Sequence, residues 1–534
     1  MKKRSLLGLL LLPAALAGCV SAGPAPRTAI GPMSGERPLP GVRAPIAMPS
    51  VPPPPAVPAA PIAIHLDDAV LMALENNRQL SVQRLQPRIT GTFGPQEAAA
   101  FDPVFDGSIS FSRQRSTRRG ATNEERLLTQ GTEAVASLNE FFPTGTLLSF
   151  DLSENDQDQR PGPSSPAQTR GGMSVTQSLL RGFGLGPNLA SLRQARLDTL
   201  ISEYELRGFA ETLAADVESA YWDCALAQRQ IVIYSDSLQL AERQLKQTED
   251  RITVGTLAPT ERAAAQAEVA LRREALIDAR SALAASRLRL LRLLNPPGGL
   301  TAEEVTLQDE PTPPVELEME DPNPHVALAM RMRPELNEAR LRIQHGDLEL
   351  VKTRNGLLPQ LDLFAALGRS GYARSFSDAS DRTTQGNNYD ATVGLSLEIP
   401  VGNRAARAAH QRATLDREQN ARALENLAQL VELDVRLAWI EVLRAREQVT
   451  ATAATLRYQE EVLRAEQAKF EADKSTSFLV AQAQNALVAA RVQEVVAVVA
   501  CLKSLSDLYR LEGSLLERRR IAAPGNQPPE SQRE

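Results

Sequence analysis

The chain has 534 residues, of which 43% are hydrophobic, only 4% are aromatic and 23% are charged. Few aromatic residues beside abundant Ala, Leu, Gln, Glu and Arg are typical of long packed helices rather than of a thick globular core. The formal net charge is −6. Because a nucleic-acid-binding surface needs a basic excess, we expect no nucleic-acid partner.

The N-terminus predicts export from the cytoplasm. Basic residues at 2–4 precede an apolar run at 6–12, and "LAGC" follows at 16–19. A basic start, a short apolar segment and small residues form a secretory signal that is too short to span a membrane. "LAGC" resembles the bacterial lipoprotein box, which implies cleavage before Cys19, lipidation of Cys19 (palmitate included) and, with Val20 next, sorting to the outer membrane. The alternative is an ordinary signal with a chance cysteine.

The next segments are a tether and a helix. Residues 19–64 are rich in proline, with "PPPP" at 52–55, and such a segment is expected to be a stiff extended spacer without helix or sheet. Apolar residues then recur at helical spacing in "HLDDAVLMALENNRQL" (65–80).

From Phe101 the apolar period changes to two. Phe105, Ile109 and Phe111 share one face of a strand, and "ATVGLSLEI" (391–399) alternates almost throughout. Short strands separated by polar loops favour a transmembrane barrel, and the alternative is a soluble β-sandwich in the periplasm. No segment after the signal has 18 consecutive apolar residues, so we expect no transmembrane helix.

The longest pattern is a coiled-coil seam. Apolar residues from Leu206 to Leu245 are spaced by three and four residues, in alternation almost throughout. A helix over 187–254 would span roughly 100 Å, and its return over 259–294 only roughly 55 Å. The short helices at 66–90 and 326–356 could fill this difference in length, one in each half of the chain.

The chain contains this unit twice. Shifting the twelve seam positions by 218 residues, without a gap, leaves ten of them apolar, and "DVESAYW" (216–222) becomes "DVRLAWI" (434–440). Two unrelated coiled coils are the alternative, but flanking helices and strands repeat as well. The predicted segments are 1–18 signal peptide, 19–64 tether, 65–100 first short helix, 101–182 first strands, 183–296 first hairpin, 297–325 linker, 326–358 second short helix, 359–400 second strands, 401–513 second hairpin and 514–534 disordered tail.

Several stretches, in this order and duplicated, resemble the TolC-type outer membrane efflux proteins of the lipoprotein subtype. They are "HLDDAVLMALENN", "VTQSLLRGFGLG", "RITVGTLAPTERAAAQAEV", "GLLPQLDL" and "VGLSLEIPVGNR". The resemblance implies a mainly α fold with a membrane β-barrel. In that family three identical chains form an α-barrel tunnel joined to one shared barrel in outer membrane lipid. The narrow end docks on a periplasmic adaptor of an inner-membrane pump, so the implied function is a passive export duct for efflux or type I secretion.

The two hairpin tips are the candidate docking sites. By the resemblance, an Arg followed by a Val-Gly-Leu-like turn binds the adaptor, whereas the alternative is that Gly and Pro merely end and start helices. The matching residues in the first tip are Arg251, Val254, Gly255, Thr256, Leu257 and Ala258. The second tip contains Lys469, Asp473 and Ser475 but no glycine, which leaves open whether both tips bind the adaptor.

The tunnel constriction also departs from the family. Acidic residues often close the tunnel beyond the second tip, but Leu479 and Gln482 stand there. A ring of Leu479 could constrict the bore by dewetting, or Leu479 could simply pack between helices.

No enzyme is predicted, and no cofactor or metal site. His65, His325, His345 and His410 lack metal-ligand spacing. "GFGLG" (182–186) lacks the dinucleotide fingerprint and is interpreted as a flexible joint between barrel and tunnel. A rival hypothesis is a lipid-anchored periplasmic coiled-coil scaffold or adaptor.

The number of barrel strands is open. With two strands in each repeat, a trimer would have 12 barrel strands. The first repeat has four apolar runs, and if all four are barrel strands the trimer would have 18. We expect 12, with the extra pair as a hairpin in a loop. The cargo, pump and gating stay open.

Overall fold

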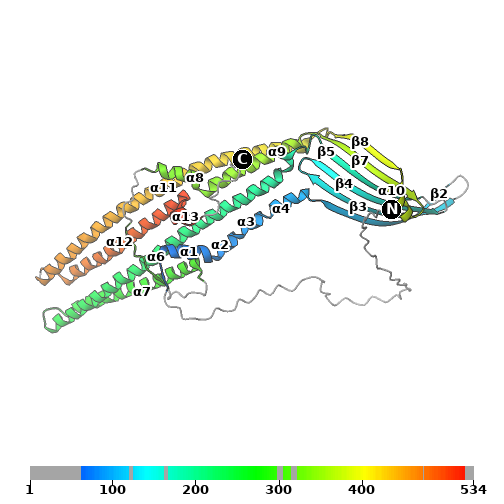
Figure 1. Cartoon of the computed structure of the whole chain (residues 1–534). Helices are drawn as coiled ribbons and strands as arrows, with labels where there is room; N and C mark the ends of the chain where they lie inside the picture. Colours follow the sequence, from blue (N-terminus) through cyan, green and yellow to red (C-terminus); the bar gives the residue numbers. More distant parts are fainter. Residues whose placement is uncertain are drawn as a thin grey trace, which may run out of the picture. The chain divides into compact units, whose positions relative to one another are not determined.

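The computed structural model describes residues 62–119, 124–160, 166–296, 305–313, 321–472 and 474–522 (Figure 1). Its helices are α1 (Leu66–Asn76), α2 (Arg78–Gln83), α3 (Leu85–Thr90), α4 (Phe93–Ala98), a 3-10 turn (Ala99–Phe101), α5 (Leu185–Asn188), α6 (Ala190–Thr253), α7 (Glu261–Leu294), α8 (Asn323–Met332), α9 (Pro334–Gly356), α10 (Phe376–Gln385), α11 (Arg404–Glu471), α12 (Ser477–Glu512) and α13 (Leu515–Arg518). Its strands are β1 (Ile62–Ile64), β2 (Val104–Arg119), β3 (Glu124–Phe142), β4 (Thr146–Arg160), β5 (Ala167–Ser178), β6 (Val305–Leu307), β7 (Gln360–Ala373) and β8 (Tyr389–Glu398). The order confirms the tandem repeat of short helices, strands and a helical hairpin.

Six strands form one antiparallel sheet in the order β2-β3-β4-β5-β7-β8. All four runs of the first repeat are therefore strands of the same sheet as the pair from the second repeat. The expectation that two of them form a hairpin in a loop is wrong. Their alternation is interrupted by glycine and charged residues, so the sequence signal was weaker than that of β8.

The two long hairpins pack through the seams expected from the sequence. α6 packs against α7 and α12, and α12 packs against α11 (Figure 1). Val217 and Cys224 belong to the core of the first hairpin, and Val435 and Val442 to the core of the second. α6 has 64 residues and α7 only 34. α3 and α4 also pack on α6, and α9 packs on both α6 and α11. Short helices therefore continue the layer where α7 and α12 end, as expected.

One described helix, α12, is long and apolar enough to cross a membrane by length and composition alone, with a mean hydropathy of 1.6 over its best window. The expectation of no such segment rested on uninterrupted apolar runs, and α12 passes because isolated polar residues barely lower its average. A third of that window is buried in the chain, and Val480, Ala483 and Leu487 pack in a hairpin core with Leu463 of α11. These contacts favour α12 as a hairpin helix.

Three segments expected to be irregular are ordered. The end of the tether, β1, pairs in parallel with β6 from the linker. In the tail, α13 buries Leu515 and Leu516. Between β7 and β8, α10 packs on β7 and β5. Each segment is short, and its stability comes from long-range contacts that local composition does not reveal.

The "GFGLG" segment connects β5 to α5, but hydrogen bonds hold it. Gly182 and Gly184 have φ of +85° and +86°, which only glycine adopts readily. The Gly182 amide donates to Asn355 Oδ1 at 2.8 Å, and Asn188 Nδ2 donates to the Gly182 carbonyl at 2.7 Å. The segment is therefore a braced connection rather than the flexible joint expected.

Candidate channel-forming surfaces and docking tip

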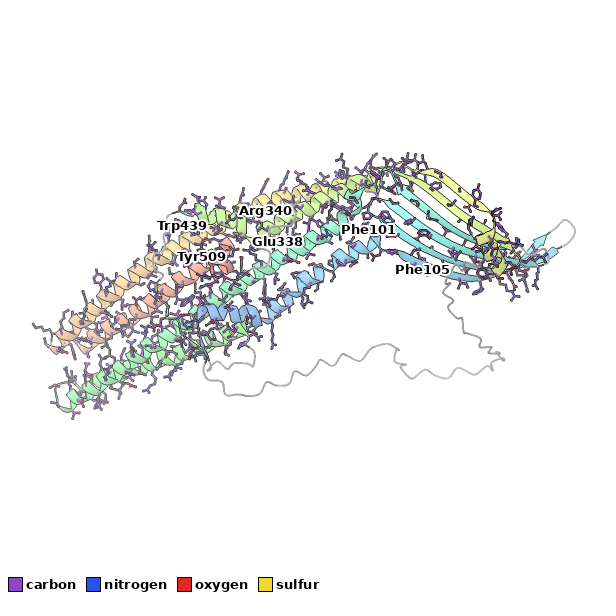
Figure 2. All side chains as sticks on the ribbon, viewed as in Figure 1. Phe101, Phe105, Glu338, Arg340, Trp439 and Tyr509 are labelled. Carbon is purple, nitrogen blue, oxygen red and sulfur yellow. The ribbon has the colours of Figure 1, made fainter. Side chains whose placement is uncertain are left out.

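The six-stranded sheet has one apolar and one polar face. The strand registers place alternate residues of all six strands on the apolar face. Its exposed members include Phe105, Ile109, Phe111, Leu138, Phe150, Leu152, Met173, Leu363, Leu367, Tyr389, Val393, Leu395 and Leu397, and the exposed Ile399 follows directly after β8. Phe105, for example, is 71% exposed on β2 (Figure 2). Such a continuous exposed apolar surface is far larger than soluble monomers tolerate, and it marks a lipid or protein contact.

The opposite face is polar and carries a cluster of three charged side chains. Arg170 of β5 pairs with Asp390 of β8 at 2.7 Å and with Asp151 of β4 at 3.3 Å. The Arg170 side chain can lie across the sheet because Gly368 and Gly172 leave space: a Cβ at Gly368 would lie 2.9 Å from Arg170 Nη2, and one at Gly172 would lie 3.0 Å from Asp151. Polar residues on one face and apolar residues on the other are the pattern of a wall between water and lipid.

The two ends of the helical layer each expose an apolar stripe. α7 stands at one end of the order α7–α6–α12–α11, and α11 stands at the other. The exposed apolar residues are Leu271, Ile277 and Leu288 on α7, and Leu430, Leu433, Leu437 and Ile440 on α11. The sheet likewise ends with β2 from the first repeat and β8 from the second. Both layers therefore end with one free edge from each repeat.

The first predicted docking tip is an exposed turn. Gly255 has φ of +82°, and the Arg251 carbonyl accepts hydrogen bonds from the Thr256 amide at 2.9 Å and the Thr256 hydroxyl at 3.0 Å. Val254, Thr256 and Ala258 are exposed, whereas Leu257 is half-buried. The backbone bonds close the turn through Arg251 and leave the small side chains on the surface.

The Arg251 side chain lies 5.1 Å above the ring of Phe470, which belongs to the second hairpin. A second contact between the hairpins joins Ser477 Oγ to the Glu261 carboxylate. Neither contact could be predicted from the sequence, because the partners are more than 200 residues apart. The structure thus brings the two predicted tips together.

In the second tip, Lys469 and Ser475 both bind Glu466. The Lys469 ammonium, together with the Ser475 hydroxyl, lowers the pKa of the Glu466 carboxyl. Asp473 lies outside the described residues, as does Cys19. The capping residue of α12 is Thr476, whose side chain accepts from the Leu479 amide at 3.4 Å.

The two constriction candidates lie in the first turns of α12. Leu479 is 42% exposed, and Gln482 is exposed as well. The neighbouring Val480 and Ala483 are buried in the hairpin core. Leu479 and Gln482 themselves lie at the surface of the single chain.

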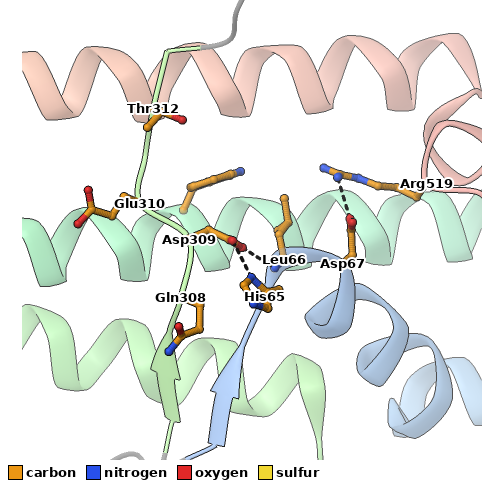
Figure 3. A pocket seen from close by; sticks show the side chains of 9 residues that line it. His65, Leu66, Asp67, Gln308, Asp309, Glu310, Thr312 and Arg519 are labelled. Atoms are coloured by element: carbon orange, nitrogen blue, oxygen red, sulfur yellow. Dashed lines mark hydrogen bonds and ion pairs between the residues drawn. The ribbon is translucent and has the colours of Figure 1, made fainter.

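A polar pocket of about 570 Å³ lies where the tether joins α1 (Figure 3). Asp309 accepts from the Leu66 amide at 2.7 Å and lies 2.8 Å from both His65 Nδ1 and the Tyr221 hydroxyl. Burial alone would raise the pKa of Asp309, but these bonds hold it below its usual value. The hydrogen bond with Asp309 raises the pKa of His65. Asp67 pairs with Arg519 at 2.9 Å.

Among the described residues, no group of three or more His, Cys, Asp or Glu side chains could hold a metal ion. Cys224 and Cys501 are free and buried. The pocket could not be predicted from the sequence, because its residues come from the start of α1, from α6, from the linker and from the tail, which have no shared motif.

A sheet with an apolar and a polar face, continued by paired long helices, defines a class of membrane channel proteins. The family model "Outer membrane efflux protein" matches residues 70–296 and 326–514, so the chain belongs to that family and is an efflux protein of the outer membrane. The family description names transport rather than a reaction. No curated protein sequence matches the chain.

Solved structures show the same fold at low identity. The outer-membrane channel OprN is 16% identical, with 84% of this chain and 90% of that chain covered and a TM-score of 0.63. The CmeC outer membrane channel of Campylobacter jejuni is 14% identical, with 88% of each chain covered and a TM-score of 0.62. The outer membrane protein VceC of Vibrio cholerae is 13% identical, with 84% and 96% covered and a TM-score of 0.61.

Proposed function

We propose that three copies of the chain form a passive export duct that crosses the outer membrane and continues through the periplasm. The two-faced sheet carries this proposal. Because every backbone group must be hydrogen-bonded in lipid, a sheet with free edges spans a membrane only after it closes into a barrel. The chain has one free sheet edge from each repeat, and pairing of unlike edges around an axis closes a ring.

The height of the apolar face fits this role. On β8 and the residue that follows it, the alternating apolar positions extend from Ala391 to Ile399. Eight residue steps span roughly 26 Å along a strand, or roughly 20 Å along the axis of a barrel whose strands tilt by about 40°. The apolar band of an outer membrane barrel is about 25 Å tall. The polar face with Arg170 would then line the water-filled lumen.

Membrane attachment has two parts in this proposal, namely the barrel and a lipid on Cys19. The two parts are separable in the variant Cys19→Ser, which removes the lipid and leaves the sheet intact. We expect this variant to stay in the membrane fraction, to require detergent for extraction, to elute as a trimer and to form conducting channels in planar bilayers. A water-soluble, non-conducting Cys19→Ser protein would instead support the lipid-anchored scaffold and refute the duct.

The first hairpin tip is the proposed contact with a periplasmic adaptor, and through it with an inner-membrane pump. Exposed small residues around Gly255 leave backbone and side chains accessible to another protein. The test is a cysteine crosslink to the adaptor encoded in the same organism: Thr256→Cys should form an adduct, whereas Glu274→Cys, exposed on the middle of α7, should not. Equal adducts at both positions would argue against docking at the tip.

A further inference from the structure

The first repeat contributes four strands to a single uninterrupted sheet. β2 and β3 are paired from Val104–Asn139 to Arg119–Glu124, and β3 and β4 from Phe142–Thr146 to Leu128–Arg160. β4 then pairs with β5, and β5 with β7. The pair β3–β4, which was expected to be a hairpin in a loop, thus has a longer ladder than the β7–β8 pair of the second repeat.

The turn between β3 and β4 is built into the connection between sheet and helices. Asn188 Nδ2 donates to the Pro143 carbonyl at 3.0 Å, and the Gly184 amide donates to the Thr144 carbonyl at 3.1 Å. Gly145 has φ of +86°, and a Cβ there would lie 2.2 Å from the Gly182 carbonyl oxygen. A turn held this closely belongs to the wall itself, because a loop excursion would not need these contacts.

The outer strands of the sheet are complementary in direction and in face. β2 leaves the short helices and runs away from them, whereas β8 runs back toward α11, so β8 of one copy meets β2 of the next in antiparallel orientation. The odd-numbered residues of both strands lie on the apolar face. Pairing must therefore join odd to odd and even to even residues, since a shift by one would turn one strand over.

The registers also fix which residues can meet. Starting at Val104, successive pairs lead through Asn139, Ser149, Ser174 and Ala366 to Thr392 of β8. Full overlap of β8 with β2 of the next copy places Glu398 opposite Val104. Thr392 and Glu398 are six residues apart, so the strands shift by six residues per copy and by 18 residues around three copies. For 18 strands this corresponds to a strand tilt of roughly 35°, within the range of closed barrels.

We propose that three copies close an 18-stranded barrel in which β8 of each copy pairs with β2 of the next, with Glu398 opposite Val104. The proposal rests on the export-duct function and goes beyond it. The register brings together the apolar pairs Leu397–Phe105, Val393–Ile109 and Ala391–Phe111, and such cross-strand pairs stabilise a sheet.

The consequence is a wide outer mouth. At strand spacings of 4.7–4.9 Å and this tilt, 18 strands give a backbone diameter of roughly 34 Å, against roughly 23 Å for 12 strands. α10 does not narrow this lumen, because it packs on Gly371 and on Ala373 and Ala167 of the apolar face. Barrels of 16–18 strands hold an aqueous channel, so a barrel of this size leaves an open path for the cargo.

The test uses the full-length protein in membranes with the cysteine pair Asp106→Cys and Ser396→Cys. These polar-face positions face each other in the proposed register, at a Cα separation that permits a disulfide. Oxidation should give covalent dimers and trimers. Two control pairs keep Ser396→Cys. In the pair with Phe105→Cys, the two side chains lie on opposite faces of the sheet. In the pair with Ser112→Cys, the second cysteine lies six residues along β2 from the proposed partner position, Asp106. Native Cys224 and Cys501 are buried and do not interfere.

A cryo-electron microscopy map of the trimer in nanodiscs counts the strands directly. Eighteen strands and linkage of the 106–396 pair alone support the proposal. A conducting trimer with 12 wall strands, or with linkage mainly in a control pair, overturns it while leaving the export duct intact. A soluble or non-conducting protein refutes the duct itself.

Discussion

In the first repeat the chain crosses the sheet four times before it enters α6, whereas in the second it crosses twice before α11. The long helices that follow have nearly equal lengths of 64 and 68 residues. Helix length is constrained because both long helices belong to one layer, in which α9 and α12 each pack against both of them. Strand number is less constrained, since an added antiparallel hairpin returns the chain to the same end of the sheet with the same face outward. Such a protein can therefore widen its sheet without changing its helices.

Charged substitutions on the two faces of the sheet should differ strongly in their effect on stability. Leu395 and Ser396 are neighbours on β8 but face opposite sides. Leu395→Arg should lower the free energy of unfolding in lipid by about 2–4 kcal/mol, because it places a charge in the bilayer, whereas lumen substitutions leave stability nearly unchanged. Denaturant unfolding in vesicles measures the difference between Leu395→Arg and Ser396→Arg. Equal losses in the two variants would contradict the assignment of the faces.

The next comparison is between two glycines with positive φ. Gly145 in the sheet–helix connection and Gly255 in the first tip have φ of +86° and +82°. Alanine at either position costs about 1 kcal/mol in left-handed backbone. At Gly145 the added Cβ also meets the Gly182 carbonyl, whereas nothing lies within 4 Å at Gly255. Gly145→Ala should therefore cost about 3 kcal/mol in total.

Thermal unfolding of the detergent-solubilised trimers gives the readout for both glycine variants. We expect a clearly larger drop in Tm for Gly145→Ala than for Gly255→Ala. Similar drops would mean that the connection relaxes around a side chain and that the β3–β4 turn is not held tightly.

The helical layer should respond to pH through Glu338 on α9 (Figure 2). Burial, helped by repulsion from Glu205, raises the pKa of Glu338 to about 7, although Arg342 opposes this at 3.6 Å. The folded chain thus holds a proton that the unfolded chain releases near pH 4.5. Stability should rise as the pH falls from 8 to 5, by about 2 kcal/mol from this residue.

The variant Glu338→Gln removes the titrating group and keeps the shape of the side chain. Its unfolding free energy should vary less between pH 5 and 8 than that of the wild-type protein, and it should exceed the wild-type value at pH 8. The same pH profile in both proteins would assign the effect to other groups, among them Glu211, whose pKa burial also raises to about 7.

The helical hairpins and their repeat could be predicted because periodicity is local. Val217 and Val435 lie at matching places in two seams, and both are buried. β8 was predictable for the same reason, since its residues alternate cleanly. The β1–β6 pair, α10 and α13 could not be predicted, because three to ten residues carry little local signal and partners such as Tyr221 and Asp309 are distant in sequence.

The docking residues likewise include features that local sequence predicts and features that depend on distant contacts. The exposed turn at Gly255 follows from glycine in a helical pattern, so its place at the end of α6 was predictable. The position of the Arg251 side chain over Phe470 was not, because it depends on how two hairpins pack. Cys19 and Asp473 remain predictions, since both lie outside the described residues.

Loss of the contact between the two tips should change local stability only slightly. Phe470→Leu keeps an apolar side chain but removes the ring beneath the Arg251 guanidinium. An exposed cation–π contact contributes about 0.5–1 kcal/mol, so amide hydrogen exchange in the first tip should accelerate roughly two- to fivefold. Phe478→Leu is the matched control, since Phe478 is 72% exposed at the start of α12 and has no ring contact recorded among the described residues. Faster exchange at Thr256 in Phe470→Leu alone would show that the hairpins restrain each other at the tunnel end, whereas unchanged exchange would show that each tip is held by its own backbone bonds.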